Sequence, residues 1–172
     1  MSALNLILIG MPACGKSTLG VMAAKALGWD FLDTDVHVQV RERATLQALI
    51  EARGVAAFKA LEAEHVRALT LDRTVVATGG SVVFSAAAMA HLRALGRVVW
   101  LQVGLDELAR RVGDLAARGV LHRPGQTLGD ILLEREPLYR RFAHAAVRCD
   151  GRAPEAVVAE LAAAVRAPKP SL

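Results

Sequence analysis

Residues 10–17, Gly-Met-Pro-Ala-Cys-Gly-Lys-Ser, constrain the fold more than any other stretch of the chain. They match the pattern G-x-x-x-x-G-K-[ST], and they stand between an apolar run over 4–9 and helix-forming residues over 18–27. A strand that ends at the first glycine and a helix that begins near the second leave a loop whose backbone N–H groups point inward. Together with the partial positive charge of the helix N-terminus, this loop predicts a binding site for phosphate groups.

The residue types in this loop indicate a nucleoside triphosphate. The Lys16 ammonium is suited to the outer phosphates, and the Ser17 hydroxyl is suited to a magnesium ion that bridges two of them. A glycine-rich turn without a ligand is the alternative, but the strand and helix on either side argue against it. We expect the nucleotide to contact Gly10, Ala13, Cys14, Gly15, Lys16, Ser17 and Thr18. Cys14 either fits the loop because it is small or carries a reactive thiol.

Short apolar runs alternate with helical stretches along the rest of the chain. The runs over 30–33, 74–77, 97–103 and 145–149 are predicted strands, with helices between them. This alternation predicts an α/β fold, a single domain over 1–172 in which helices cover both faces of a parallel sheet. Residues 113–129 are polar and punctuated by glycines, so we expect them to form a mobile lid.

Carboxylates and glycines follow two of these predicted strands directly. Asp33 and Asp35 stand at the end of the run over 30–33, and Gly79 and Gly80 follow the run over 74–77. Because ligands bind at the carboxyl ends of parallel strands, we expect these residues to face the phosphate loop. One carboxylate is suited to hold magnesium through water and the other to accept a proton from a substrate hydroxyl. A helix cap in a solvated turn is the alternative for the pair.

Composition narrows the class of partner. Aromatic residues make up 4% of the chain, and the net charge of +4 is spread without a block of like charge, which argues against a nucleic-acid partner. The two cysteines lack the spacing of a metal site or a disulfide framework, which suits a reducing cytoplasm. No apolar run is long enough to span a membrane, and no signal peptide is apparent. We expect a cytoplasmic monomer that binds small molecules.

An ordered set of short motifs resembles the shikimate kinase family over nearly the whole chain. Besides the phosphate loop, the set comprises Asp33-Thr34-Asp35, Phe58-Lys59-x-x-Glu62, Gly79-Gly80 and Glu134-Arg135-x-Pro137-Leu138-Tyr139. The resemblance implies a three-layer P-loop kinase fold with five parallel strands. It also implies that ATP, with Mg²⁺, phosphorylates a hydroxyl of shikimate while a lid closes over the nucleotide.

The resemblance further implies a role for each matching residue. Lys16 lies on the phosphates, Ser17 and Asp33 are near the magnesium ion, and Asp35 is the base that binds the hydroxyl. The acceptor is surrounded by Lys59, Gly79, Gly80 and Arg135. Arg111, or its neighbour Arg110, lies against the adenine unless it faces solvent. A lid arginine covers the transferred phosphate; Arg118 has the spacing of the family, and Arg123 is the alternative.

Three departures from the family pattern concern the acceptor and the lid. Lys59 stands where the family usually has an arginine, and its ammonium cannot reproduce a planar two-bond contact with a carboxylate. Ser81 replaces the usual third glycine, and 118–125 differ from the usual Arg-Pro-Leu-Leu. Glu62 either orients Lys59 or forms an ion pair on its helix. Two alternatives therefore remain: the same reaction on another small hydroxy-acid or sugar acid, or an ATP-binding regulatory module without an acceptor.

Overall fold

The computed structural model describes residues 5–112 and 125–166, and their centre is a parallel sheet of five strands. The strand order is β2-β3-β1-β4-β5, with β1 (Leu6–Ile9) in the middle. The others are β2 (Asp30–Asp33), β3 (Thr74–Ala77), β4 (Arg97–Gln102) and β5 (Ala145–Arg148). The predicted α/β fold with five parallel strands is confirmed. Strands β2 to β5 lie within a residue of their predicted bounds, whereas β1 begins at Leu6, two residues after the start of the apolar run.

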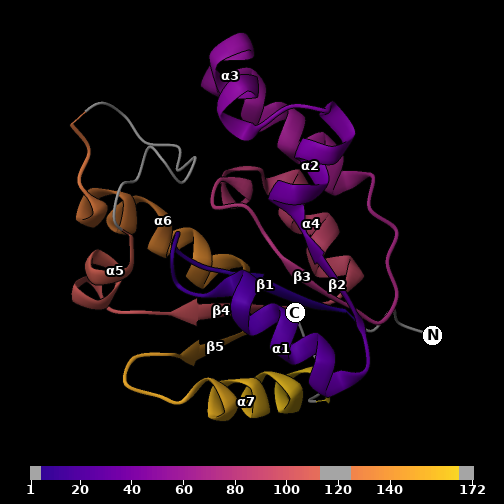
Figure 1. Ribbon diagram of the computed structural model, residues 1–172, viewed down its shortest axis with the longest axis vertical. Helices are drawn as coiled ribbons and strands as arrows, with labels where there is room; N and C mark the ends of the chain where they lie inside the picture. The colour runs from indigo at the N-terminus through magenta and orange to yellow at the C-terminus, as the bar shows by residue number, and fades with distance from the viewer. Residues whose placement is uncertain (1–4, 113–124, 167–172) are drawn as a thin grey trace.

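Helices cover both faces of the sheet and complete three layers (Figure 1). On one face, α1 (Lys16–Leu27) packs against α7 (Pro154–Arg166). On the other face lie α4 (Ala86–Leu95), α6 (Leu128–Phe142) and the C-terminal part of α3 (Leu46–Arg67). The remaining elements are α2 (Thr34–Glu42), the short 3₁₀ helix η1 (Val82–Phe84) and α5 (Leu105–Val112).

The central strands are buried on both faces, which explains their uninterrupted apolar sequences. All residues of β1 and β3 are buried. At the opposite edge from the phosphate loop, the Asn5 side chain ties neighbouring segments together. Its Nδ2 donates to the carbonyls of Leu71 and Leu95 at 3.0 and 2.9 Å, and its Oδ1 accepts from Thr74 N at 2.9 Å. These bonds satisfy buried backbone groups and fix the start of the sheet.

Helices α2 and α3 extend beyond the sheet (Figure 1) and have a small core of their own. Val38, Leu49 and Phe58 form this core. Thr45 caps α3 by accepting from Ala48 N at 3.2 Å. Gly54 forms a kink within α3, where φ is 78° and ψ is 162°. This pair of helices forms one side of the cavity described below.

The helix that follows the predicted lid over 113–129 begins two residues before the end of that segment. The helix α6 begins at Leu128 because Thr127 caps it, accepting from Asp130 N at 3.2 Å. Asp130 Oδ2 in turn accepts from Thr127 N at 2.8 Å, which completes a capping box. The last two residues of the predicted lid, Leu128 and Gly129, therefore belong to α6. The rest of the lid, 113–124, with Arg118 and Arg123, lies outside the described residues.

Candidate active site

The loop between β1 and α1 has the backbone conformation that a phosphate cradle requires. Gly15 has a φ of 99° and Ala13 a φ of 63°, so the chain turns sharply before α1 begins at Lys16. Gly10 has no room for a side chain. A Cβ there would lie 2.8 Å from the Leu101 carbonyl oxygen and 2.9 Å from Cys14 Sγ. The loop therefore presents backbone N–H groups and a helix N-terminus at the carboxyl edge of the sheet.

The Lys16 side chain lies folded over this loop. Its Nζ donates to the carbonyl oxygens of Gly10 and Met11 at 3.0 and 2.9 Å, and it lies 3.8 Å from Cys14 Sγ. Cys14 is fully buried under the loop. Burial agrees with the first interpretation of Cys14, a small residue that fits the loop, because the thiol is not accessible to an oxidant.

Asp33 joins the end of β2 to the loop. Its Oδ2 accepts a hydrogen bond from Ser17 Oγ at 2.6 Å, and its Oδ1 accepts from Asp35 N at 2.9 Å and Val36 N at 3.4 Å. The carboxylate thus caps α2 with one oxygen and faces the phosphate loop with the other. Of the two interpretations drawn from the sequence, a helix cap and a site residue, the geometry of Asp33 accommodates both.

Asp35 lies in the first turn of α2 and lines the cavity. The pKa of this carboxyl is raised to about 6, chiefly by burial and also by the nearby charge of Asp33, whereas Lys16 opposes the rise. A carboxyl with a pKa near 6 is ionised at neutral pH yet is a stronger base than an exposed one. That combination suits a group that accepts a proton from a hydroxyl.

A cavity of about 450 Å³ connects the phosphate loop with the acidic residues. Its walls come from seven parts of the chain: the phosphate loop, α1, β2, α2, α3, the β3–η1 turn and α6. The lining residues are Pro12, Ala13, Gly15, Lys16, Ser17, Thr18, Asp33, Asp35, Leu46, Phe58, Glu62, Thr78, Gly80, Ser81 and Arg135. Most of the residues expected at the site therefore share one cavity, although five of those described do not line it: Gly10, Cys14, Lys59, Gly79 and Arg111.

The two glycines after β3 differ in what they contribute. Gly79 lies behind the wall, where its N–H donates to Thr34 Oγ1 at 2.8 Å. Gly80 lines the cavity, and a Cβ at this position would lie 2.6 Å from an Nη atom of Arg135. Glycine at this position therefore allows the Arg135 guanidinium to approach the backbone of the turn.

The Arg135 side chain is almost completely buried, with 2% of its surface exposed, yet it reaches the cavity. Its guanidinium carbon lies 5.5 Å from the centre of the Phe84 ring, and Lys59 Nζ lies 4.3 Å from the centre of the same ring. Two cations thus lie close to one aromatic ring. Next to them, the Tyr139 ring stacks on Trp100 with the ring centres 5.7 Å apart, and burial raises the pKa of Tyr139.

Glu62 lines the cavity, a position that neither interpretation drawn from the sequence gave it. It is 2% exposed, and its Oε2 accepts a hydrogen bond from Ser81 Oγ. No ion pair between Glu62 and Lys59 is found among the described residues. A signal was present in the sequence: Phe58, Glu62 and Val66 recur every four residues, which places Glu62 on the buried stripe of α3.

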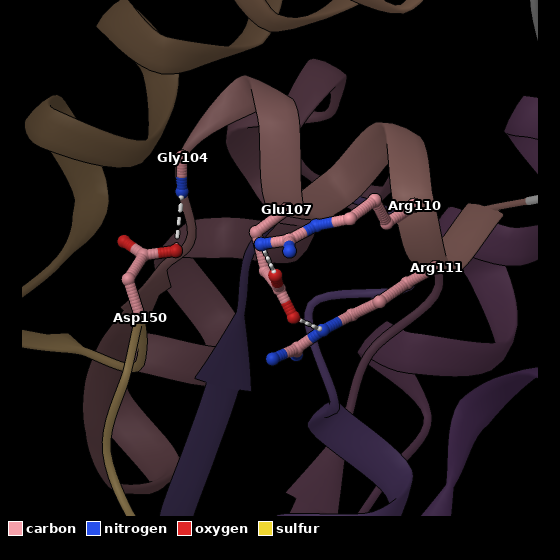
Figure 2. A network of polar contacts seen from close by, with 5 residues as sticks. All are labelled: Gly104, Glu107, Arg110, Arg111 and Asp150. Carbon is pink, nitrogen blue, oxygen red and sulfur yellow. Dashed lines mark hydrogen bonds and ion pairs between the residues drawn. The ribbon is translucent and has the colours of Figure 1, made fainter.

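Arg110 and Arg111 both pair with Glu107 on the same helix, as Figure 2 shows. Arg111 Nε lies 2.6 Å from Glu107 Oε1. Beside them, Asp150 Oδ1 accepts from Gly104 N at 2.9 Å and so joins the turn after β4 to the turn after β5 (Figure 2). The two arginines therefore lie at the carboxyl edge of β4 and β5, on the surface of α5.

Comparison with known proteins agrees with this geometry. The sequence profile of the family described as shikimate kinase matches residues 12–166. Shikimate kinase of Chromohalobacter salexigens is 36% identical over 160 residues, 91% of this chain and 89% of that protein. Shikimate kinase of Moorella thermoacetica is 36% identical over 165 residues, 95% of each chain.

Solved structures give the same result. A structure of shikimate kinase from Acinetobacter baumannii in complex with shikimate has a TM-score of 0.85 and 30% identity, and it covers 93% of this chain and 91% of that chain. The structure from Aquifex aeolicus has a TM-score of 0.81 and 29% identity, with 94% and 95% covered. The chain belongs to the shikimate kinase family of ATP-dependent kinases that act on a hydroxyl group.

Proposed function

We propose that this protein transfers the γ-phosphoryl group of ATP to a hydroxyl group of shikimate. The observation that carries the proposal is the convergence of Lys16, Asp35 and Arg135 on one cavity. Phosphoryl transfer needs neutralised phosphate charge, an oriented hydroxyl and a fixed acceptor, and these three residues are suited to those tasks in that order. Family membership and the likeness to a shikimate complex support the choice of acceptor.

The proposed roles at the nucleotide follow from the chemistry of each group. The backbone from Gly10 to Thr18 binds the phosphates, and Lys16 exchanges its bonds to the loop carbonyls for bonds to phosphate oxygens. Arg111 lies against the adenine. A lid arginine, Arg118 or in its place Arg123, covers the transferred group.

Ser17 and Asp33 fit a magnesium ion. Their oxygens meet at 2.6 Å beside the phosphate loop, and Mg²⁺ prefers such hard oxygen ligands, in part through water. When bound, the ion neutralises charge that develops on the phosphate oxygens. Asp33 keeps its second oxygen on the N-terminus of α2, so its carboxylate does not have to reorient to serve the ion.

At the acceptor, Asp35 orients the reacting hydroxyl and accepts its proton as the oxygen attacks the γ-phosphorus. Arg135 holds the acceptor carboxylate with two parallel hydrogen bonds, and Lys59, beside the Phe84 ring, adds a point charge. The backbone at Gly80 forms the floor between them, and Gly79 supports it through Thr34. We further propose that the protein acts in the cytoplasm as a monomer; among the described residues, no helix has the length and apolar character to cross a bilayer.

The proposal is tested by ADP formation with shikimate and with a panel of small hydroxy-acids and sugar acids, at saturating MgATP. We expect shikimate to give the highest kcat/KM. Asp35→Asn should lower kcat on the order of 10²–10⁴-fold with little change in the affinity for ATP. The matched control is Asp30→Asn, an exposed carboxylate at the far end of β2, which should leave kcat unchanged. Turnover of another acid but not of shikimate, or a normal kcat for Asp35→Asn, would contradict the proposal.

A further inference from the structure

Glu62 and Ser81 make a buried contact in the cavity wall that the roles proposed above do not use. Both line the cavity, and their exposed fractions are 2% and 7%. The Ser81 hydroxyl donates to Glu62 Oε2. The other oxygen, Oε1, lies against the Cα of Gly79, on the side that Asp35 Oδ1 also approaches. The carboxylate of Glu62 is thus fixed between α3 and the β3–η1 turn.

Charged groups from three helices surround this carboxylate: Asp35 on α2, Lys59 on α3 and Arg135 on α6. The pKa of Glu62 is raised to about 7, chiefly by burial, while the hydrogen bond from Ser81 opposes the rise. The charge of Asp35 contributes to the rise, whereas Arg135 and Lys59 oppose it. Near neutral pH, a single hydrogen bond is therefore enough to alter the fraction of Glu62 that is ionised.

We propose that Ser81 and Glu62 act together as positioning residues that set the net charge of the acceptor pocket. The Ser81 hydroxyl stabilises the ionised form of Glu62, and the negative charge of Glu62 partly offsets Arg135 and Lys59. The inference rests on the proposed function, since those two cations are the groups that would hold an acceptor carboxylate. It gives position 81 a purpose that a glycine could not serve, because glycine offers no side-chain donor to the buried carboxylate.

The sign of the expected effect follows from the charges. At pH values below the pKa of Glu62 its carboxyl is neutral, so both cations attract the acceptor carboxylate without opposition and KM is low. At higher pH the ionised Glu62 reduces that attraction and KM rises, by about three- to tenfold for a partly buried neighbouring charge. Replacing Ser81 by alanine removes a bond to the ionised form, so it moves this transition to higher pH.

The experiment is steady-state kinetics with shikimate between about pH 6 and pH 8.5 for wild type, Ser81→Ala and Glu62→Gln. Calorimetric titration with shikimate alone gives dissociation constants that do not depend on the chemical step. We expect KM and Kd of wild type to rise with pH, the midpoint of Ser81→Ala to lie about 0.5–1 pH unit higher, and Glu62→Gln to lose this rise. Ser85→Ala is the control, since it removes a hydroxyl that caps α4 outside the cavity and should keep the wild-type midpoint.

Four other outcomes would overturn the inference, and one of them would overturn the proposed function as well. A wild-type protein that turns over shikimate with the same KM across this range would overturn the inference and leave the proposed function standing. A Ser81→Ala midpoint equal to that of wild type, or an unchanged rise in Glu62→Gln, would also overturn it. If wild type gives no shikimate-dependent ADP, the proposed function fails and the inference fails with it. Thermal unfolding of each variant establishes that the proteins compared are folded. If Ser81 only supported the fold, its replacement would not move the pH midpoint of KM.

Discussion

The closest packing in the site is around Gly79, so the change from glycine to alanine at this position makes a severe test. A Cβ at Gly79 would lie closer than 3.0 Å to Glu62 Oε1 and Asp35 Oδ1, and 3.3 Å from Glu62 Cδ. Neither carboxylate can easily yield: Glu62 is 2% exposed and bonded to Ser81, and Asp35 is held in the first turn of α2. The φ of Gly79 is not in the left-handed region, so the cost is one of packing rather than of backbone strain.

The magnitude follows from two contributions. Forcing a methyl group into a filled site costs about 1–3 kcal/mol, and displacing Glu62 from Ser81 sacrifices a buried charge-assisted hydrogen bond of about 1–3 kcal/mol. We expect Gly79→Ala to lower the free energy of unfolding by about 2–4 kcal/mol. Because the same methyl group displaces Asp35, kcat should fall by about 100-fold in the fraction that remains folded.

Denaturant unfolding, followed by circular dichroism, measures the first effect, and ADP formation at saturating substrates measures the second. Gly129→Ala is the matched control. A Cβ there would meet Leu105 Cδ2 and Thr127 Oγ1 at an ordinary 3.6 Å, inside α6. Alanine in a helix gains up to about 1 kcal/mol over glycine, so this variant should be at least as stable as wild type. A Gly79→Ala protein with wild-type stability and kcat would refute the contact geometry at Gly79.

Three further predictions follow from the same site. Lys16→Ala should abolish phosphoryl transfer, whereas the surface control Lys25→Ala should keep it; the two variants should have the same unfolding midpoint. Full activity in a folded Lys16→Ala protein would disprove the role of Lys16. Lys59→Arg should lower the KM for shikimate, by up to about tenfold if two parallel hydrogen bonds replace a point charge, and an unchanged KM would exclude Lys59 from the acceptor site. Because the pKa of Glu62 is raised from 4.5 to about 7, its contribution to stability is complete below about pH 4.5 and is lost as pH rises through 7. The unfolding free energy of Glu62→Gln relative to wild type should therefore increase by up to about 3 kcal/mol between those pH values, and equal pH dependence of the two proteins would count against the buried position of Glu62.

The sequence predicts the sheet and the phosphate loop well because both depend on local signals. Strands buried on two faces are continuous apolar runs, as β1 and β3 are, and the loop has a fixed spacing of glycines and lysine. The start of α6 was equally local, since Thr127 and Asp130 stand in the spacing of a capping box, but with aspartate in place of the more usual glutamate.

The contacts behind the cavity wall could not be predicted in the same way, because they join residues far apart in the chain. The bond from Gly79 N to Thr34 Oγ1 spans 45 residues, and the bond from Ser81 to Glu62 joins two different elements. Glu62 followed by charged neighbours is also typical of an exposed helix face, so its burial depends on where α3 is placed against η1. The sequence pattern identifies residues with suitable chemistry, but tertiary packing determines which of them meet in the wall of the cavity.

The position of β1 in the middle of the sheet affects how the protein is made. Leu6 pairs with Val75 of β3 on one side and with Arg97 of β4 on the other. The ribosome therefore makes β3 roughly 70 residues after β1, and β4 roughly 90 residues after β1. At about 5–20 residues per second, this strand waits several seconds with both edges unpaired. An apolar segment in that condition is prone to aggregate or to bind a chaperone. The strand that carries the phosphate loop is therefore open to misassembly until β3 and β4 have been made.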